Sequence, residues 1–329
     1  MIQKKFDLGM HWPTADPFLF FAHHHDHYPP GNGEWGPQAD LTGRNLGMDF
    51  DPEQSFRMYH GQKVPGFPVH PHRGFETITI VNQGLADHAD SMGAAGRYGH
   101  GDVQWMTAGK GVQHSEMFPC LNSDKDNPLE LFQIWLNLPK KNKMVPPEYV
   151  MFWSESIPVV SGPGVNVRVI AGGYQGVNGL PAPKNSWATD PSNDVSIWLM
   201  DLKPGSAFTI PSAPVGLFRA LYFFSGEKLQ VGSETLSGKQ GVFLDSEKEV
   251  TVKASKSAAR LLLLQGKPIN EPVVQHGPFV MNTQQEIMQA FAEYQSTQFG
   301  GWPWPREDMV HGGEQRRFAK YQDGQEETP

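Results

Sequence analysis

The stretch GFPVHPHRGFETITIVNQG, residues Gly66–Gly84, is typical of strands that end in a turn. Val, Ile, Thr and Phe recur through it, and Asn-Gln-Gly closes it, as in a protein rich in β-hairpins. His70 and His72 stand two residues apart near its start. Because side chains alternate along a strand with a period of two, we expect both imidazoles on one face.

A second stretch, GDVQWMTAGKGVQHSEMF (Gly101–Phe118), repeats this arrangement with His114 and Glu116. Gly109 and Gly111 precede the pair and permit the backbone bend that aims a ligand inward. If the two strands face each other across a barrel, three imidazoles and one carboxylate converge on a point.

Such a set of side chains suits a divalent transition-metal ion. Imidazole and carboxylate are intermediate to hard ligands, and no thiolate competes with them, which favours Fe, Mn, Co, Ni or Cu. Four protein ligands leave one or two positions of an octahedron open, as expected for catalysis or ligand exchange. One short His spacing is equally compatible with histidines on unrelated strands, and the second period-two pair favours the metal site.

Four motifs resemble those of the pirin family of the cupin superfamily: HPHRGFET, GDVQWMTAG, HSEM and, after them, FQIWLNLP (Phe132–Pro139). The similarity continues to EPVVQHGPFVMNT (Glu271–Thr283) and so spans most of the chain. The resemblance implies two tandem jelly-roll-like cupin barrels, with a C-terminal segment packed back on the first. It also implies one metal ion per chain, iron(II) being the family's usual metal, with Mn, Co, Ni, Cu and Zn as alternatives.

The fourth ligand has two candidates. Glu76 lies four residues after His72, where many cupins carry a glutamate, and it shares parity with both histidines of its stretch, so geometry alone leaves it open. The pirin resemblance favours Glu116, because HSEM is how that family presents its carboxylate. Glu116 is then both ligand and catalytic base, and Glu76 could hold an imidazole N–H.

The whole sequence is typical of an all-β protein, because 35 glycines and 28 prolines punctuate short apolar runs. We predict a metal-binding barrel over residues 1–140, a linker over 141–149, a metal-free barrel over 150–281, and a helix with a tail over 282–329. The helix over Asn282–Gln295 begins with a capping box. Equal steps from the turn glycines of the second barrel replace the four ligands by other residues, namely Ser212, Pro214, Ala254 and Lys256.

Other polar residues are interpreted more simply. The cluster His23–His27 looks like a metal tract, but adjacent side chains alternate faces, so we expect a loop rim. Arg73 is expected at an exposed rim in a salt bridge, and His88 and His100 on the surface or in turns. Trp302 and Trp304 are expected to dock on the body of the protein, and the chain to end in disordered polar residues.

Composition limits the possible partners. The net charge of −8 argues against general binding to nucleic acid or to an anionic membrane. With the single Cys120 no internal disulfide can form, which favours a reducing cytoplasm. No signal peptide or membrane span is expected, although nuclear residence in a eukaryote stays open.

The resemblance implies a dioxygenase that cleaves flavonols such as quercetin with O2. In that interpretation Trp105, Met106 and aromatic residues of the strand over Leu129–Pro139 line the pocket and exclude water. The alternative is a non-enzymatic regulator, in which the redox state of the metal alters affinity for a transcription factor or a metabolic enzyme.

Overall fold

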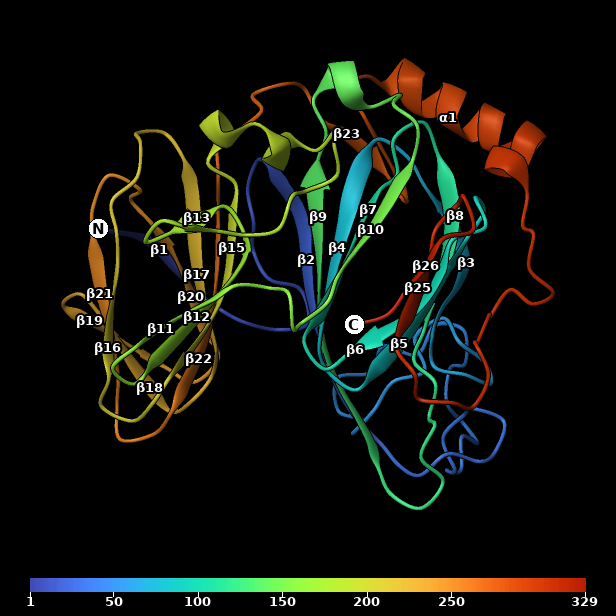
Figure 1. Ribbon diagram of the computed structural model, residues 1–329, viewed down its shortest axis with the longest axis horizontal. Helices are drawn as coiled ribbons and strands as arrows, with labels where there is room; N and C mark the ends of the chain where they lie inside the picture. Colours follow the sequence, from blue (N-terminus) through green and yellow to red (C-terminus); the bar gives the residue numbers. More distant parts are fainter. The chain divides into compact units, whose positions relative to one another are not determined.

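The computed structural model describes residues 1–329, and the chain divides into two compact units (Figure 1). We call the unit of Ala22–Ser154 and Glu271–Pro329 the first barrel, and that of Met1–Phe21 and Glu155–Asn270 the second barrel. Both consist mainly of antiparallel strands in two sheets. The predicted all-β architecture with two barrels is therefore confirmed.

The first barrel contains a five-stranded and a six-stranded sheet, whose facing side chains meet: Thr79 of one donates a hydrogen bond to Glu116 of the other at 2.8 Å. In spatial order the five strands are β10 (Glu148–Phe152), β7 (Asp102–Thr107), β4 (Phe75–Gln83), β9 (Asn127–Asn137) and β2 (Phe18–Tyr28). The six are β26 (Glu326–Glu327), β25 (Phe318–Lys320), β6 (Ala95–Gly99), β5 (Leu85–Asp90), β8 (Val112–Met117) and β3 (Gly66–His72).

The second barrel contains a seven-stranded and a four-stranded sheet, and side chains of both form one apolar core. The seven strands are β1 (Ile2–Asp7), β20 (Gln240–Leu244), β17 (Phe218–Ser225), β22 (Ala259–Gly266), β15 (Ser196–Leu202), β12 (Val165–Ala171) and β11 (Val159–Gly162). The four are β16 (Ala207–Ile210), β21 (Val250–Ala254), β18 (Lys228–Val231) and β19 (Glu234–Ser237). Core residues include Val167, Leu221 and Leu263 from the larger sheet, and Ile210, Leu229 and Val252 from the smaller.

The remaining elements are short. Two hairpins are β13 (Gly173–Tyr174) with β14 (Val177–Asn178), and β23 (Val274–His276) with β24 (Phe279–Met281). The 3-10 helices are η1 (Lys140–Asn142), η2 (Trp187–Thr189), η3 (Pro191–Asn193) and η4 (Gln298–Gly300). The α-helix is α1 (Gln284–Thr297).

The predicted C-terminal helix is confirmed. Thr283 is its N-cap and accepts a hydrogen bond from the backbone N–H of Glu286, whose carboxylate accepts one in return from the Thr283 hydroxyl. Phe291 packs edge-on against Phe279 with the ring centroids 4.8 Å apart, and the Tyr294 hydroxyl donates to the side chain of Gln113 in β8. The helix therefore packs back on the first barrel, as the resemblance implied.

Both chain termini differ from the sequence-based division. The first strand, assigned to the first barrel, instead pairs with β20, with Lys5 opposite Val242. The tail, expected to be disordered, forms β25 and pairs with β6, with Phe318 opposite Arg97. A strand pattern shows that a segment pairs and which of its faces is buried, but not which sheet edge it joins, and this explains both differences.

Candidate metal centre

The two histidine stretches are neighbours in one sheet. β3 and β8 pair antiparallel, and His70 lies directly opposite His114 in the register. The expectation that these strands face each other across the barrel was wrong, but the alternation argument holds, because His70 and His72 lie on the same side as His114. The three imidazoles therefore converge as predicted, although through strand pairing within one sheet.

His70, His72 and His114 place one ring nitrogen each within 4.8 Å of the others. The Nδ1 atom of His70 hydrogen-bonds the Pro68 carbonyl at 2.8 Å, so it carries the proton and leaves Nε2 as the electron-pair donor. His72 and His114 are buried, and Nδ1 of His72 and both nitrogens of His114 have no hydrogen-bond partner. Since unpartnered buried nitrogens are costly, the set fits a divalent transition metal that would take the electron pair of one nitrogen on each ring.

The electrostatics favour neutral imidazoles. Burial lowers the pKa of His70, and it holds the pKa of His72 and of His114 well below the usual value, with the neighbouring histidines adding to the effect. Neutral imidazole is the form that binds metal. The three side chains are therefore in the ligand state at neutral pH.

Glu116 is buried in the same barrel and follows His114 by two residues in β8. It is not part of the converging histidine group. Its Oε1 accepts hydrogen bonds from the hydroxyls of Thr79 at 2.8 Å and Tyr98 at 3.0 Å, and its Oε2 accepts one from Gln133 Nε2 at 2.7 Å. Three strands thus hold the carboxylate beside the histidines.

The alternative ligand Glu76 lies on the other face of β4. Phe75 contacts His72 and Thr79 contacts Glu116, so odd-numbered residues of the strand face the site and Glu76 faces away. Glu76 accepts a hydrogen bond from the Thr107 hydroxyl at 2.7 Å instead.

Two residues expected at the surface are buried. Arg73 is 2% exposed; the predicted salt bridge exists, with Glu293 of α1 at 2.8 Å, but the helix covers the guanidinium. His88 is fully buried, 5.5 Å from His114 between ring centroids and stacked on Tyr149. His88 lies in β5, next to β8, a pairing that no local spacing indicates.

The wall around the histidines is aromatic. The ring centroid of His72 lies 5.0 Å from that of Phe75 and 5.4 Å from that of Trp135, which belongs to the predicted long strand. Trp105, also expected there, instead packs against Phe152. Apolar rings therefore lie on the side of the site formed by β4 and β9.

The C-terminal segment covers the outside of β3 and β5. The backbone N–H of Val69 donates to the Glu307 carbonyl at 2.9 Å, and the indole N–H of Trp304 donates to the Asp90 carbonyl at 2.7 Å. The expectation that Trp304 docks on the body is confirmed.

The His23–His27 cluster does not join the metal centre. His25 and His27 are exposed, and His23 contacts Glu130 at 3.2 Å and stacks on Phe132. The prediction of a loop rim was wrong, because the whole cluster lies within strand β2. As expected from the alternation of faces, its rings do not form a converging ligand group.

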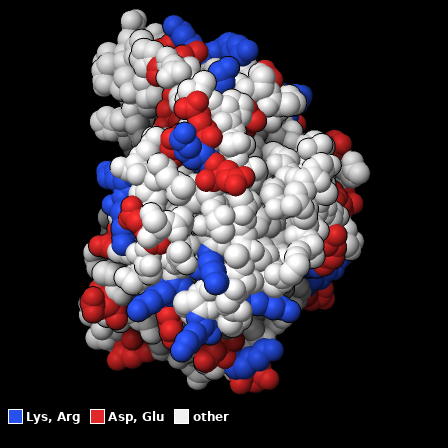
Figure 2. Space-filling view, turned by 90° about the vertical axis from the view of Figure 1, so that its left-hand side faces the viewer, with Lys and Arg blue, Asp and Glu red and all other residues white.

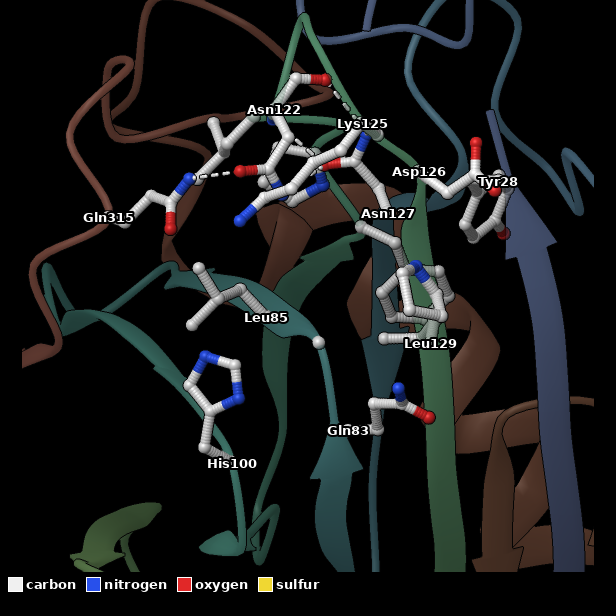
Figure 3. A pocket seen from close by; sticks show the side chains of 15 residues that line it. Tyr28, Gln83, Leu85, His100, Asn122, Lys125, Asp126, Asn127, Leu129 and Gln315 are labelled. Carbon is white, nitrogen blue, oxygen red and sulfur yellow. Dashed lines mark hydrogen bonds between the residues drawn. The ribbon is translucent and has the colours of Figure 1, made fainter. Parts of the chain in front are cut away.

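A cavity of about 340 Å³ lies at the other end of β4 (Figure 3). Gln83, Leu85 and His100 lie along its lower side in this view, and none of the three converging histidines lines it. The Gln315 amide donates to Asn122 at 2.8 Å, as the dashed line shows. This cavity is therefore separate from the metal centre.

Figure 2 shows basic and acidic side chains in small mixed groups on the face it presents, without a continuous basic field. None of the helices has the length and apolar character needed to span a bilayer.

Comparison with known proteins agrees with the fold. Residues 3–136 match the family model described as Pirin, and residues 197–300 match the Pirin C-terminal cupin domain. The chain is 40% identical to a pirin-like protein of Caulobacter vibrioides, over 80% of this chain and 90% of that protein. It is 34% identical to pirin of Homo sapiens, over 78% and 86% of the two chains.

A crystal structure of quercetin 2,3-dioxygenase from Acinetobacter baumannii superposes with a TM-score of 0.72 at 28% identity, covering 91% of this chain and 98% of that one. The barrels described above are thus cupin domains, and the resemblance seen in the sequence motifs is confirmed. The chain belongs to the pirin family.

Proposed function

We propose that this protein is a metal-dependent dioxygenase that cleaves flavonols such as quercetin with O2, and that its metal is iron(II). The observation that carries the proposal is the group of three imidazoles, one half-buried and two buried, whose ring nitrogens converge within 4.8 Å, with Glu116 held beside them. The structural similarity to a quercetin 2,3-dioxygenase supports the substrate class.

The metal, when bound, would supply Lewis-acid and redox chemistry for a flavonol and O2 at its open positions. His70, His72 and His114 would hold it, and the Pro68 carbonyl fixes the tautomer of His70. Mn, Co, Ni, Cu and Zn are alternatives, because the same donors accept them as well.

Glu116 is proposed as the fourth ligand and as the base that takes the proton of the flavonol 3-hydroxyl. Its three hydrogen-bond donors, Thr79, Tyr98 and Gln133, stabilise the charged carboxylate inside the barrel. The same contacts keep it in place for proton transfer, since a base must lie within hydrogen-bond reach of the proton it accepts.

Phe75 and Trp135 would position the flat rings of the flavonol and exclude water from the reacting centre. Both rings lie within about 5.5 Å of His72, and aromatic faces bind planar rings by offset stacking. This wall is the feature of the site that favours an aromatic substrate over a small polar one.

The test is oxygen uptake with quercetin by protein loaded with Fe(II), Mn, Co, Ni, Cu or Zn, with apo protein as the reference. We expect turnover with iron, loss of turnover in His114→Ala, and normal turnover in His100→Ala, which removes an exposed histidine of the same barrel. Absence of turnover with every metal would refute the proposal and favour the alternative of a redox-sensitive regulator that binds a protein partner.

Glu116→Gln separates the two roles of the carboxylate. If Glu116 is only a base, metal content measured by mass spectrometry stays near one ion per chain while kcat falls about 10²–10⁴-fold, the usual range for losing a general base. If it is also a ligand, the metal affinity falls as well. Unchanged kcat and unchanged affinity would exclude both roles.

A further inference from the structure

The second barrel contains a cavity that has no part in the metal centre. Its volume is about 610 Å³, within the range of small-molecule sites. Its wall includes Ser212 and Pro214, the residues that sequence steps placed where the first barrel carries His70 and His72. The barrel that lacks those histidines therefore still has a hollow at that segment.

The cavity is lined by a buried guanidinium, that of Arg219 in β17, which is 2% exposed. Its Nε and Nη2 donate to the side-chain oxygen of Gln265, and its Nη1 donates to the Pro211 carbonyl at 2.9 Å. A guanidinium has five N–H groups, so one on each terminal nitrogen stays free. Those two form the end of the fork that binds a carboxylate in a bidentate manner.

The charge of Arg219 is not paired. All its hydrogen-bond partners are neutral, and Asp245 and Asp194 act on it only at longer range. Burial lowers the pKa of Arg219 to about 10, so the side chain stays protonated at neutral pH. The charge is thus buried and without a contacting anion, an arrangement that is costly unless a ligand completes it.

Other groups that line the cavity define what kind of anion fits. Leu180, Pro181 and Val195 give apolar walls. Trp198 also lines it, and its buried indole N–H has no hydrogen-bond partner. Asp190, exposed, and Asp194, half-buried, are the two acidic side chains on the wall and disfavour a multiply charged anion.

A purely structural role for Arg219 does not explain why a charged side chain is buried at this position. Arg219 and Gln265 are register partners on β17 and β22, so the contact between them does tie two strands. A neutral donor would tie them equally well without the cost of burying a charge.

We propose that the second barrel binds a small organic carboxylate with an apolar body, whose carboxylate is held by Arg219. The site is independent of the metal centre and of the proposed dioxygenase activity. The ligand is monoanionic, because the wall offers one cation and two carboxylates.

Calorimetry with benzoate, the uncharged isostere benzamide and inorganic phosphate tests the proposal. We expect benzoate to bind once per chain, and benzamide and phosphate to bind at least about tenfold more weakly. Arg219→Gln removes a charge-assisted pair and should lower benzoate affinity about 10- to 100-fold. Arg219→Lys keeps the charge but loses the bidentate geometry, so its benzoate affinity should lie between those of the wild type and Arg219→Gln. Lys253→Met removes an exposed positive charge of the same barrel and serves as the matched control.

His114→Ala tests whether benzoate binds instead to a metal in the first barrel. We expect this variant to bind benzoate with the affinity of the wild type. A crystal of the unaltered chain soaked with benzoate gives a readout that does not depend on any variant folding. Density for the carboxylate on Arg219 supports the proposal. Absence of benzoate binding, equal binding of benzamide, preference for phosphate, or affinity lost in His114→Ala would overturn it.

Discussion

Asp87→Asn is expected to destabilise the first barrel and to loosen the chain's C-terminal tail. Asp87 is fully buried and forms a two-pronged ion pair with Arg97, at 2.6 Å to Nε and 2.7 Å to Nη2. It also accepts a hydrogen bond from the backbone N–H of His311 at 2.8 Å, and Arg97 donates to the Gly312 carbonyl at 2.9 Å. One carboxylate therefore neutralises the cation and anchors the tail.

The expected cost follows from what the substitution leaves behind. Asparagine keeps the volume of aspartate but removes its charge, so Arg97, 1% exposed, stays buried without a counter-ion. Removing one partner of a buried pair costs about 3–5 kcal/mol. Glu326→Gln is the control, because it breaks an ion pair at the surface. Arg316 and Glu326 are 61% and 47% exposed, and such pairs contribute about 1 kcal/mol or less.

Urea unfolding measures both free energies, and amide hydrogen exchange of β25 measures attachment of the tail. Asp87→Asn should shift the unfolding midpoint several times further than Glu326→Gln and raise exchange in β25. Equal losses in the two variants, or a loss below about 1 kcal/mol in Asp87→Asn, would show that the buried pair is not what holds the tail.

Three further predictions concern single residues. Metal at 100 times its Kd should stabilise the wild type by about 2.7 kcal/mol in thermal unfolding and leave His114→Ala unaffected; equal stabilisation of both would place the ion elsewhere. Gly111→Ala should destabilise the protein by about 1–3 kcal/mol and so lower its unfolding temperature. The φ of +130° at this position disfavours a side chain, and the new Cβ would lie 2.8 Å from the Phe299 ring. An unchanged unfolding temperature would contradict this reasoning. Burial raises the pKa of the Cys120 thiol to about 12, so alkylation by iodoacetamide at pH 8 should be about 1,000-fold slower in native than in urea-unfolded protein. The alkylation rate of the native protein should rise about tenfold per pH unit. Mass spectrometry measures both rates, and a flat pH profile would argue against the raised pKa.

The sequence predicts the ligands better than the contacts around them. A period of two assigns His70 and His72 to one face whichever strand lies beside them, so the shared direction of these two side chains was predictable. That β3 and β8 are sheet neighbours was not, since pairing depends on strand order. The three donors to Glu116 come from β4, β6 and β9, and no local pattern links them.

Burial of polar residues was the least predictable property. The sequence around Arg73 predicts an exposed residue, but Glu293, 220 positions later in the chain, forms a hydrogen bond with it and helps to cover it. Arg219 and Gln265 are 46 positions apart and gave no motif in the sequence. In both cases the partner lies on a strand or helix whose position only the tertiary fold determines.

The exchange of terminal strands affects how the protein is made. β1 is synthesised more than 230 residues before its pairing partner β20. In the first barrel, β6 is likewise synthesised more than 210 residues before its pairing partner β25. Each barrel therefore needs strands from both sides of the linker, because β1 precedes the first barrel in the chain and β25 follows the second. A single cut within residues 141–149 would leave each fragment without a strand that its barrel requires.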